Sequence, residues 1–173
     1  MDIQTVHPVK LIIGMIFAPD SDLAIYTAHL QKVFGKPDLQ SPTYPFDMTD
    51  YYAPEMGSEL LRSFCAYRNL INPGELAEIK GLCNVIERRF SQDGKRRINL
   101  DPGYLDMDKF VLASVKYGRQ KIYIGQGIYA DPTLYYYQKV FHPYEWSFPD
   151  FRSGRYDDFF LTIRQYYKQQ RKT

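Results

Sequence analysis

The sequence predicts an α+β protein with a ferredoxin-like split βαβ core, an antiparallel sheet extension and a C-terminal helix. Three observations support this fold class. The expected elements up to Leu100 follow the order strand–helix–strand–strand–helix–strand, several short strands come next, and an amphipathic helix closes the chain. The 173 residues contain no internal repeat and no linker-like segment. We therefore expect residues 1–173 to form one α+β domain.

The first strand is expected over residues 9–18, where a β-branched, apolar run lies between two prolines. Such a run is typical of a strand that is buried on both faces. A helix should follow, with Asp20 or Ser21 as its N-cap and Gly35 at its end. Its apolar residues recur at helical spacing: Leu23, Tyr26, Leu30, Val33 and Phe34.

The segment between the two predicted helices is expected to hold two strands. A short strand is predicted over residues 41–46, a loop over residues 51–57 and a longer strand over residues 60–70. The longer segment also fits a helical period, so a helix remains an alternative there.

The second helix, over residues 73–91, has the clearest boundaries. Asn72 is the expected N-cap, Pro73 suits the first helical position, and Glu75 stands where a capping-box partner belongs. The residues expected to face the core step by three and four: Leu76, Ile79, Cys83, Ile86 and Phe90.

Strands are expected over the residues that follow, at 97–100, 110–117, 120–124, 133–137 and 140–144. The first of them should run into a turn at Asp101–Tyr104, because Pro followed by Gly suits the centre of a type II turn. A hairpin turn is expected at Gly125–Gly127. The closing helix, over residues 156–169, should direct Phe159, Phe160, Ile163 and Tyr167 inward.

Composition and charge exclude several classes of function. Lys and Arg number 22 against 20 Asp and Glu, a net charge of +2, whereas a protein dedicated to duplex DNA needs a large basic excess. The longest apolar run, residues 11–18, is too short to span a bilayer, and the N-terminus lacks the basic region of a signal peptide. We therefore expect no membrane partner and a cytoplasmic location. Cys65 and Cys83 are the only cysteines and lack metal-ligand spacing, so we expect them to be reduced, buried thiols.

Asp101 is the first candidate for chemistry. The expected turn places it at the end of a buried strand, where pockets of α/β proteins are commonly lined, so it is a candidate acid, base or metal ligand. The alternative is that Asp101 caps its own turn. His142 is the second candidate catalytic residue, although no other histidine lies at zinc-ligand spacing.

Four further residues are candidate ligand-binding groups. Arg152 and Asp150 lie among aromatic residues, an arrangement that holds planar anions and phosphates or, alternatively, pins a loop. Tyr104 follows the expected turn. Glu55 lies in an aromatic loop that would bring a second carboxylate over Asp101, and such a pair could hold Mg²⁺; the alternative is an aromatic lid that packs on the sheet.

Several motifs together resemble a known family: YYAPEMG, IERRF, NLDPGY, VLASVKYG, GIYADPTL and FPDFRS. The chain resembles an uncharacterised bacterial and archaeal domain family of unknown function, and NLDPGY and FPD-aromatic-RS are its most specific marks. Some members carry an automatic label as GTP-binding proteins. The resemblance implies a prokaryotic, soluble context and no particular activity.

The leading functional hypothesis is the binding, with or without turnover, of a small anionic, phosphate-bearing ligand in a pocket around Asp101 and Arg152. The alternative is a non-enzymatic interaction or RNA-associated module that uses a basic, tyrosine-rich sheet face with Tyr117 and Tyr123. Its basic residues would be Arg88, Arg89, Lys95, Arg96, Arg97, Lys116, Arg119 and Lys121.

The purified protein is expected to show no specific binding of GTP at micromolar concentration. Neither Gly35-Lys36 nor Gly94-Lys95 is preceded by the glycine or followed by the hydroxyl of a phosphate-binding loop, and the N-K-x-D guanine motif is missing. Isothermal titration calorimetry checks this. Saturable GTP binding with which ATP does not compete would contradict the prediction.

Overall fold

The computed structural model describes residues 2–172. The strands in this part of the chain are β1 (Val9–Phe17), β2 (Pro37–Gln40), β3 (Tyr44–Pro45), β4 (Leu61–Ile71), β5 (Ile98–Leu105), β6 (Lys109–Ser114), β7 (Ile122–Gly125), β8 (Ile128–Tyr137) and β9 (Val140–Pro143). The helices are α1 (Leu23–Phe34), α2 (Ala53–Met56), α3 (Leu76–Arg89), α4 (Pro149–Arg152) and α5 (Asp157–Gln170), and a 3₁₀ turn, Pro73–Glu75, precedes α3.

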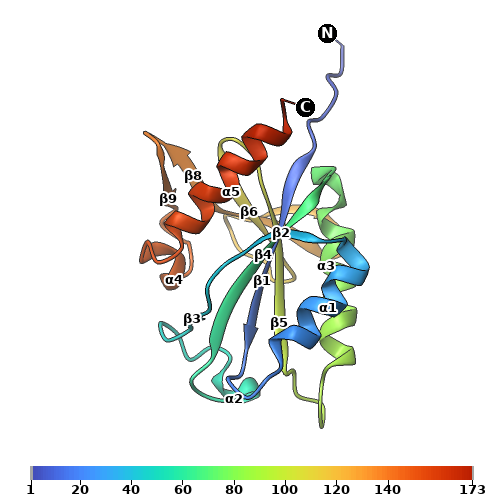
Figure 1. Ribbon diagram of the computed structural model, residues 1–173, viewed down its shortest axis with the longest axis vertical. Helices are drawn as coiled ribbons and strands as arrows, with labels where there is room; N and C mark the ends of the chain where they lie inside the picture. Colours follow the sequence, from blue (N-terminus) through green and yellow to red (C-terminus); the bar gives the residue numbers. More distant parts are fainter. Residues whose placement is uncertain (1, 173) are drawn as a thin grey trace.

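The strands form one large antiparallel sheet in the order β2-β4-β1-β5-β6-β8-β7, with β3 beside β4 and β9 beside β8. Helices α1 and α3 lie on one side of the sheet and α5 lies on the other (Figure 1). The structure thus confirms an α+β fold with a large antiparallel sheet and a C-terminal helix.

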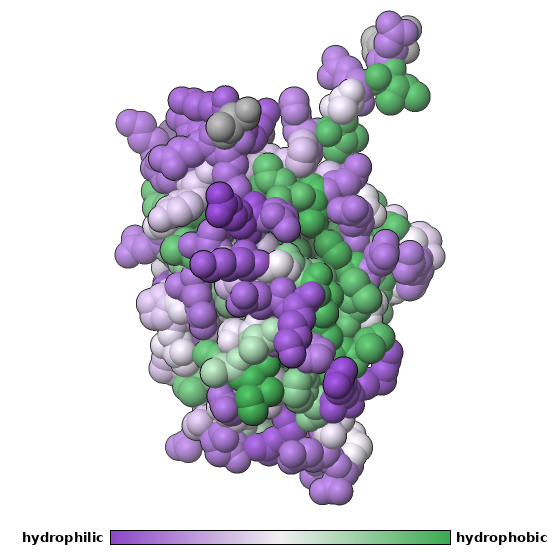
Figure 2. All heavy atoms as spheres, turned by 45° about the vertical axis from the view of Figure 1, so that its right-hand side comes forward, coloured by the Kyte–Doolittle hydropathy of each residue, from purple (hydrophilic) through white to green (hydrophobic). Residues whose placement is uncertain are grey.

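A hydrophobic core lies between each helix layer and the sheet. One joins α1 and α3 to the sheet, and the other joins α5 to the opposite face. Every residue of the central strand β1 is buried, as the run of β-branched residues predicted. Figure 2 brings the side that carries α1 and α3 forward. Polar side chains predominate in this view, and apolar side chains gather in a band between them. The exposed apolar residues of α1 and α3 include Ile25, Val33, Leu82 and Val85.

Helix α3 has the predicted cap and core stripe. The Asn72 side chain accepts a hydrogen bond from the backbone N–H of Gly74, and the Glu75 carboxylate accepts one from the N–H of Asn72. Leu76, Ile79, Cys83 and Ile86 are buried, and Phe90 packs against the core that contains Ile79, Cys83 and Ile86. The predicted inward face of α5 is also confirmed, because Phe159, Phe160, Ile163 and Tyr167 are buried.

The predicted turn at Asp101–Tyr104 is wrong, because β5 runs straight through it. These residues pair with β1, from Gly14↔Asp101 to Leu11↔Tyr104. Pro102 is tolerated because the ladder to β6 begins only at Gly103. Gly103 serves close packing instead of a turn, since a Cβ there would lie 2.5 Å from the carbonyl oxygen of Val111.

Other expectations need smaller corrections. The hairpin turn between β7 and β8 is confirmed, and both Gln126 and Gly127 have positive φ, at 52° and 74°. The strand predicted over 41–46 shrinks to β3, while β2 forms in a segment where none was predicted. The predicted loop over 51–57 contains the short helix α2. Strand β4 confirms the strand interpretation of residues 60–70.

No helix between residues 2 and 172 is long and apolar enough to cross a membrane. Cys65 and Cys83 are both free and buried, and burial raises the pKa of the Cys65 thiol to about 12.

Truncating Ile86 to Ala should lower the free energy of unfolding by about 2–5 kcal/mol, because removing buried side-chain carbons leaves a cavity between α3 and the sheet. The matched control is the adjacent Val85→Ala, whose side chain is 54% exposed and should cost within about 0.5 kcal/mol. Urea denaturation measures both. Equal losses for the two variants would show that the stripe does not face the core.

Candidate functional site

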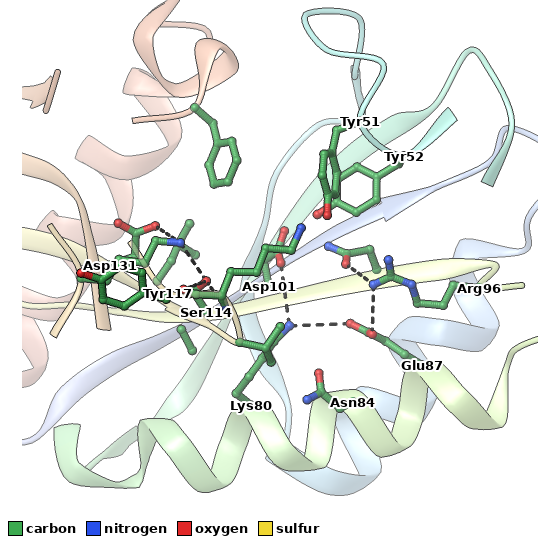
Figure 3. A pocket seen from close by; sticks show the side chains of 17 residues that line it. Tyr51, Tyr52, Lys80, Asn84, Glu87, Arg96, Asp101, Ser114, Tyr117 and Asp131 are labelled. Atoms are coloured by element: carbon green, nitrogen blue, oxygen red, sulfur yellow. Dashed lines mark hydrogen bonds and ion pairs between the residues drawn. The ribbon is translucent and has the colours of Figure 1, made fainter. Parts of the chain in front are cut away.

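A cavity of about 400 Å³ lies where β5 and β6 separate. The two strands pair only between Gly103–Leu105 and Phe110–Leu112, so the earlier half of β5 lacks a strand on that side. The cavity occupies this fork, with α3 below it (Figure 3). Its lining residues are Tyr51, Tyr52, Lys80, Asn84, Glu87, Arg96, Asn99, Asp101, Leu112, Ala113, Ser114, Val115, Lys116, Tyr117, Lys121, Asp131 and Phe148.

Two side chains of α3 replace the missing strand partner at Leu100. The ammonium of Lys80 donates to the Leu100 carbonyl oxygen at 2.6 Å, and the Leu100 N–H donates to Oε1 of Glu87 at 2.7 Å. Alternate residues of a strand direct their backbone groups to the same edge, so Pro102 would face this side too, and it has no N–H to offer. The fork is therefore built into the sequence of β5 and α3.

The floor of the cavity is a charge cluster centred on Lys80 (Figure 3). Its Nζ lies 3.8 Å from Oε1 of Glu87 and 3.9 Å from Oδ1 of Asp101. Burial raises the pKa of Glu87, and the positive charge of Lys80 opposes that shift. The cluster continues to Arg96, whose Nη1 lies 3.5 Å from Oε2 of Glu87 and 2.8 Å from Oδ1 of Asn99.

Behind Asp101 lies a buried guanidinium. Nη2 of Arg62 is 3.4 Å from Oδ2 of Asp101, while Nη1 pairs with Asp150, which also accepts a hydrogen bond from the hydroxyl of Tyr156 at 3.0 Å. Aromatic rings surround the Arg62 side chain, among them those of Phe46, Phe64, Phe151 and Tyr156. Arg62 therefore links α4 to the cavity floor.

The wall formed by the end of β6 and the start of β7 carries two lysines. Lys121 Nζ lies 3.2 Å from Oδ2 of Asp131 and 2.9 Å from Oγ of Ser114. Lys116 Nζ lies 3.8 Å from the centre of the Tyr51 ring, and within residues 2–172 it forms no ion pair with a carboxylate. Burial and the neighbouring charge of Lys121 lower the pKa of Lys116.

The structure places the predicted site residues in three groups. Asp101 lines the cavity. Glu55 contacts a lining residue, because it forms a bidentate pair with Arg96 at 2.8 and 2.6 Å, whereas Asp150 is connected to the lining through Arg62 and Asp101. Each of the two carboxylates that were expected to pair thus has cations of its own: Glu55 has Arg96, and Asp101 has Arg62 and Lys80. Within residues 2–172, no group of three or more His, Cys, Asp or Glu side chains is placed to hold a metal ion.

The remaining predicted residues lie outside the lining of this cavity. Tyr104 packs against the cluster that joins α3 to β6 and β8. His142 stacks on Tyr135, with ring centroids 5.3 Å apart, and its Nε2 lies 3.2 Å from the carbonyl oxygen of Tyr137. Arg152 is exposed at the end of α4. The arginine that lies among aromatic rings next to Asp101 is therefore Arg62, whereas Arg152 had been expected there.

Sequence reasoning missed Lys80, Glu87 and Arg62, although each left a signal. Lys80 and Glu87 lie seven residues apart, next to the core stripe of α3, so both fall toward its buried side. Arg62 is a charged residue at the start of the buried half of β4, a position that requires a partner. All three are buried in the structure.

A family model described as a domain of unknown function (DUF4416) matches residues 7–167. No curated protein and no solved structure matches the chain.

Replacing Glu87 by Gln should change the pH dependence of stability. Burial raises the pKa of Glu87 above its usual 4.5, so ionising Glu87 costs free energy in the folded protein, and that cost appears as the pH rises through the folded pKa. The amide of the variant does not ionise. The stability of the wild type relative to the Glu87→Gln variant should therefore fall as the pH is raised from about 4.5. Urea denaturation midpoints at several pH values measure it, and a wild type that becomes more stable relative to the variant as the pH rises would contradict the prediction.

Proposed function

The chain belongs to the family described as a domain of unknown function (DUF4416), and for this member we propose, from the geometry of its cavity, that the β5–β6 fork binds a small anionic, phosphate-bearing ligand. The observation that carries the proposal is the pair of lysines on one wall. Both lysines line the cavity, and burial and the charge of Lys121 lower the pKa of Lys116; of the two, only Lys121 has a carboxylate partner among the described residues. An anion between them would relieve the repulsion and gain charge-assisted hydrogen bonds.

Polar groups elsewhere in the cavity support the same ligand class. Asn99 is 3% exposed, and its Nδ2 has no hydrogen-bond partner among the described residues. A buried donor without a partner costs free energy, so an acceptor oxygen of a ligand there would be stabilising. The volume of about 400 Å³ suits a small molecule.

In this proposal Asp101 remains a candidate acid or base, and Arg152 is no longer the group that binds the anion. Asp101 faces the cavity between Lys80 and Arg62, so it is the carboxylate placed to exchange a proton with a ligand if turnover occurs. Lys116 and Lys121 take the anion-holding role that Arg152 had in the sequence-based hypothesis.

A second candidate function is an RNA-associated module, and one observation favours it. Tyr117 and Tyr123 are 77% and 60% exposed beside Lys116 and Lys121, an arrangement on which single-stranded bases can stack. Salt-dependent binding of single-stranded RNA, without binding of small phosphates, would favour this candidate.

We also propose a ferredoxin-like core and a cytoplasmic location for the protein. Strands β1, β2, β4 and β5 with helices α1 and α3 would form a ferredoxin-like core, which the antiparallel order β2-β4-β1-β5 supports. A cytoplasmic location is supported by the two free, buried cysteines.

The Lys116→Gln variant should bind a phosphate monoester about tenfold more weakly or worse, because it loses a charge-assisted hydrogen bond worth about 1.5–3 kcal/mol. Isothermal titration calorimetry with ribose 5-phosphate and with inorganic phosphate measures this. Lys116 is preferred to Lys121 because substituting Lys121 would leave the buried Asp131 without its cation.

The matched control is Lys139→Gln, in the hairpin between β8 and β9 and outside the cavity lining. It should bind the same probes as the wild type does. Equal weakening in both variants, or no phosphate binding by the wild type, would contradict the proposed function.

A further inference from the structure

We propose that the ligand of this cavity is an aromatic phosphate ester, whose ring stacks on aromatic side chains at the cavity mouth. This inference rests on the proposed function. It adds that the group to which the phosphate is attached is aromatic.

Three aromatic side chains that line the cavity are largely exposed. Tyr51 is 58% exposed, Tyr117 is 77% exposed and Phe148 is 50% exposed. They come from three separate segments: the turn before α2, the residues after β6 and the residue before α4. Exposed aromatic residues that converge on one concave site from distant parts of a chain are typical of ligand-binding sites.

The rings of Tyr117 and Phe148 are at least half exposed and make few contacts with other aromatic rings of residues 2–172. Tyr117 contacts only Tyr129 among the aromatic rings of residues 2–172, edge-on, with centroids 6.0 Å apart. Phe148 makes no ring contact within the same part of the chain. Tyr51, by contrast, contacts Tyr52 edge-on and carries the Lys116 ammonium over its face. Tyr117 and Phe148 are therefore the rings available for stacking.

The positions of these groups fit one ligand. Tyr117 lines the same cavity as Lys116 and Lys121, so the proposed anion site and a stacking surface belong to one site. Figure 3 shows Tyr51 and Tyr117 on opposite sides of the cavity, with Asp101 between them. A phosphate held by Lys116 and Lys121 would thus leave the rest of a small ligand among aromatic rings. An aliphatic phosphate would leave these ring faces without a matching partner.

The test compares phenyl phosphate with cyclohexyl phosphate, which carry the same anion on rings of similar size. Calorimetric titration of the whole protein should give an affinity for phenyl phosphate about three- to tenfold higher, the range expected for a ring–ring contact. The preference should disappear in Tyr117→Leu and persist in Tyr117→Phe, which keeps the aromatic face. Tyr137→Leu, at a similarly exposed tyrosine outside the cavity lining, should leave it unchanged.

The outcomes separate this inference from the proposed function. Equal affinities for the two esters, with binding that still depends on Lys116, would overturn the aromatic ligand and leave anion binding intact. A preference for phenyl phosphate that survives Tyr117→Leu in a folded variant would also overturn the stacking assignment. Binding of neither ester nor inorganic phosphate would remove the proposed function itself.

Discussion

The backbone of Leu100 is the point on which the candidate site depends. Its N–H and carbonyl are directed to the edge of β5 where β6 has already diverged, and Glu87 and Lys80 of α3 supply the missing hydrogen bonds. Without these two side chains, a buried peptide group would be left unpaired at a cost of about 1–3 kcal/mol for each polar atom. The same contacts fix the position of α3 under the sheet and hold the fork open as a cavity.

The side chains of Lys80 and Glu87 also belong to a larger network of ion pairs. Lys80 lies near both Glu87 and Asp101, and Asp101 lies near Arg62, which pairs in turn with Asp150 of α4. Buried charges are tolerated only when they are paired, so removing one member would expose its neighbour to the full cost of burial. This continuous network connects helices on the two sides of the sheet through the floor of the cavity.

The candidate site shows why a motif can be recognised for the wrong physical reason. Pro102 and Gly103 were expected to form a turn that projects Asp101 from a strand end, yet both residues lie inside β5. Asp101 nevertheless faces a cavity, because Pro102 ends the ladder to β6 and Gly103 allows the close approach of Val111. His142 and Arg152 followed the same local reasoning and lie elsewhere, because chain proximity to aromatic residues does not fix which face a side chain takes.

The sequence by itself determined the elements whose signals are local. The capping box of Asn72 and Glu75, the core stripes of α3 and α5, and the apolar run of β1 each satisfy nearby hydrogen bonds or a single buried face. Only the tertiary structure decided that Lys80, Glu87, Lys116 and Lys121 meet at one cavity. These residues come from helix α3 and from the loop between β6 and β7. Their meeting depends on where β6 leaves β5, a register between distant segments that no local pattern encodes.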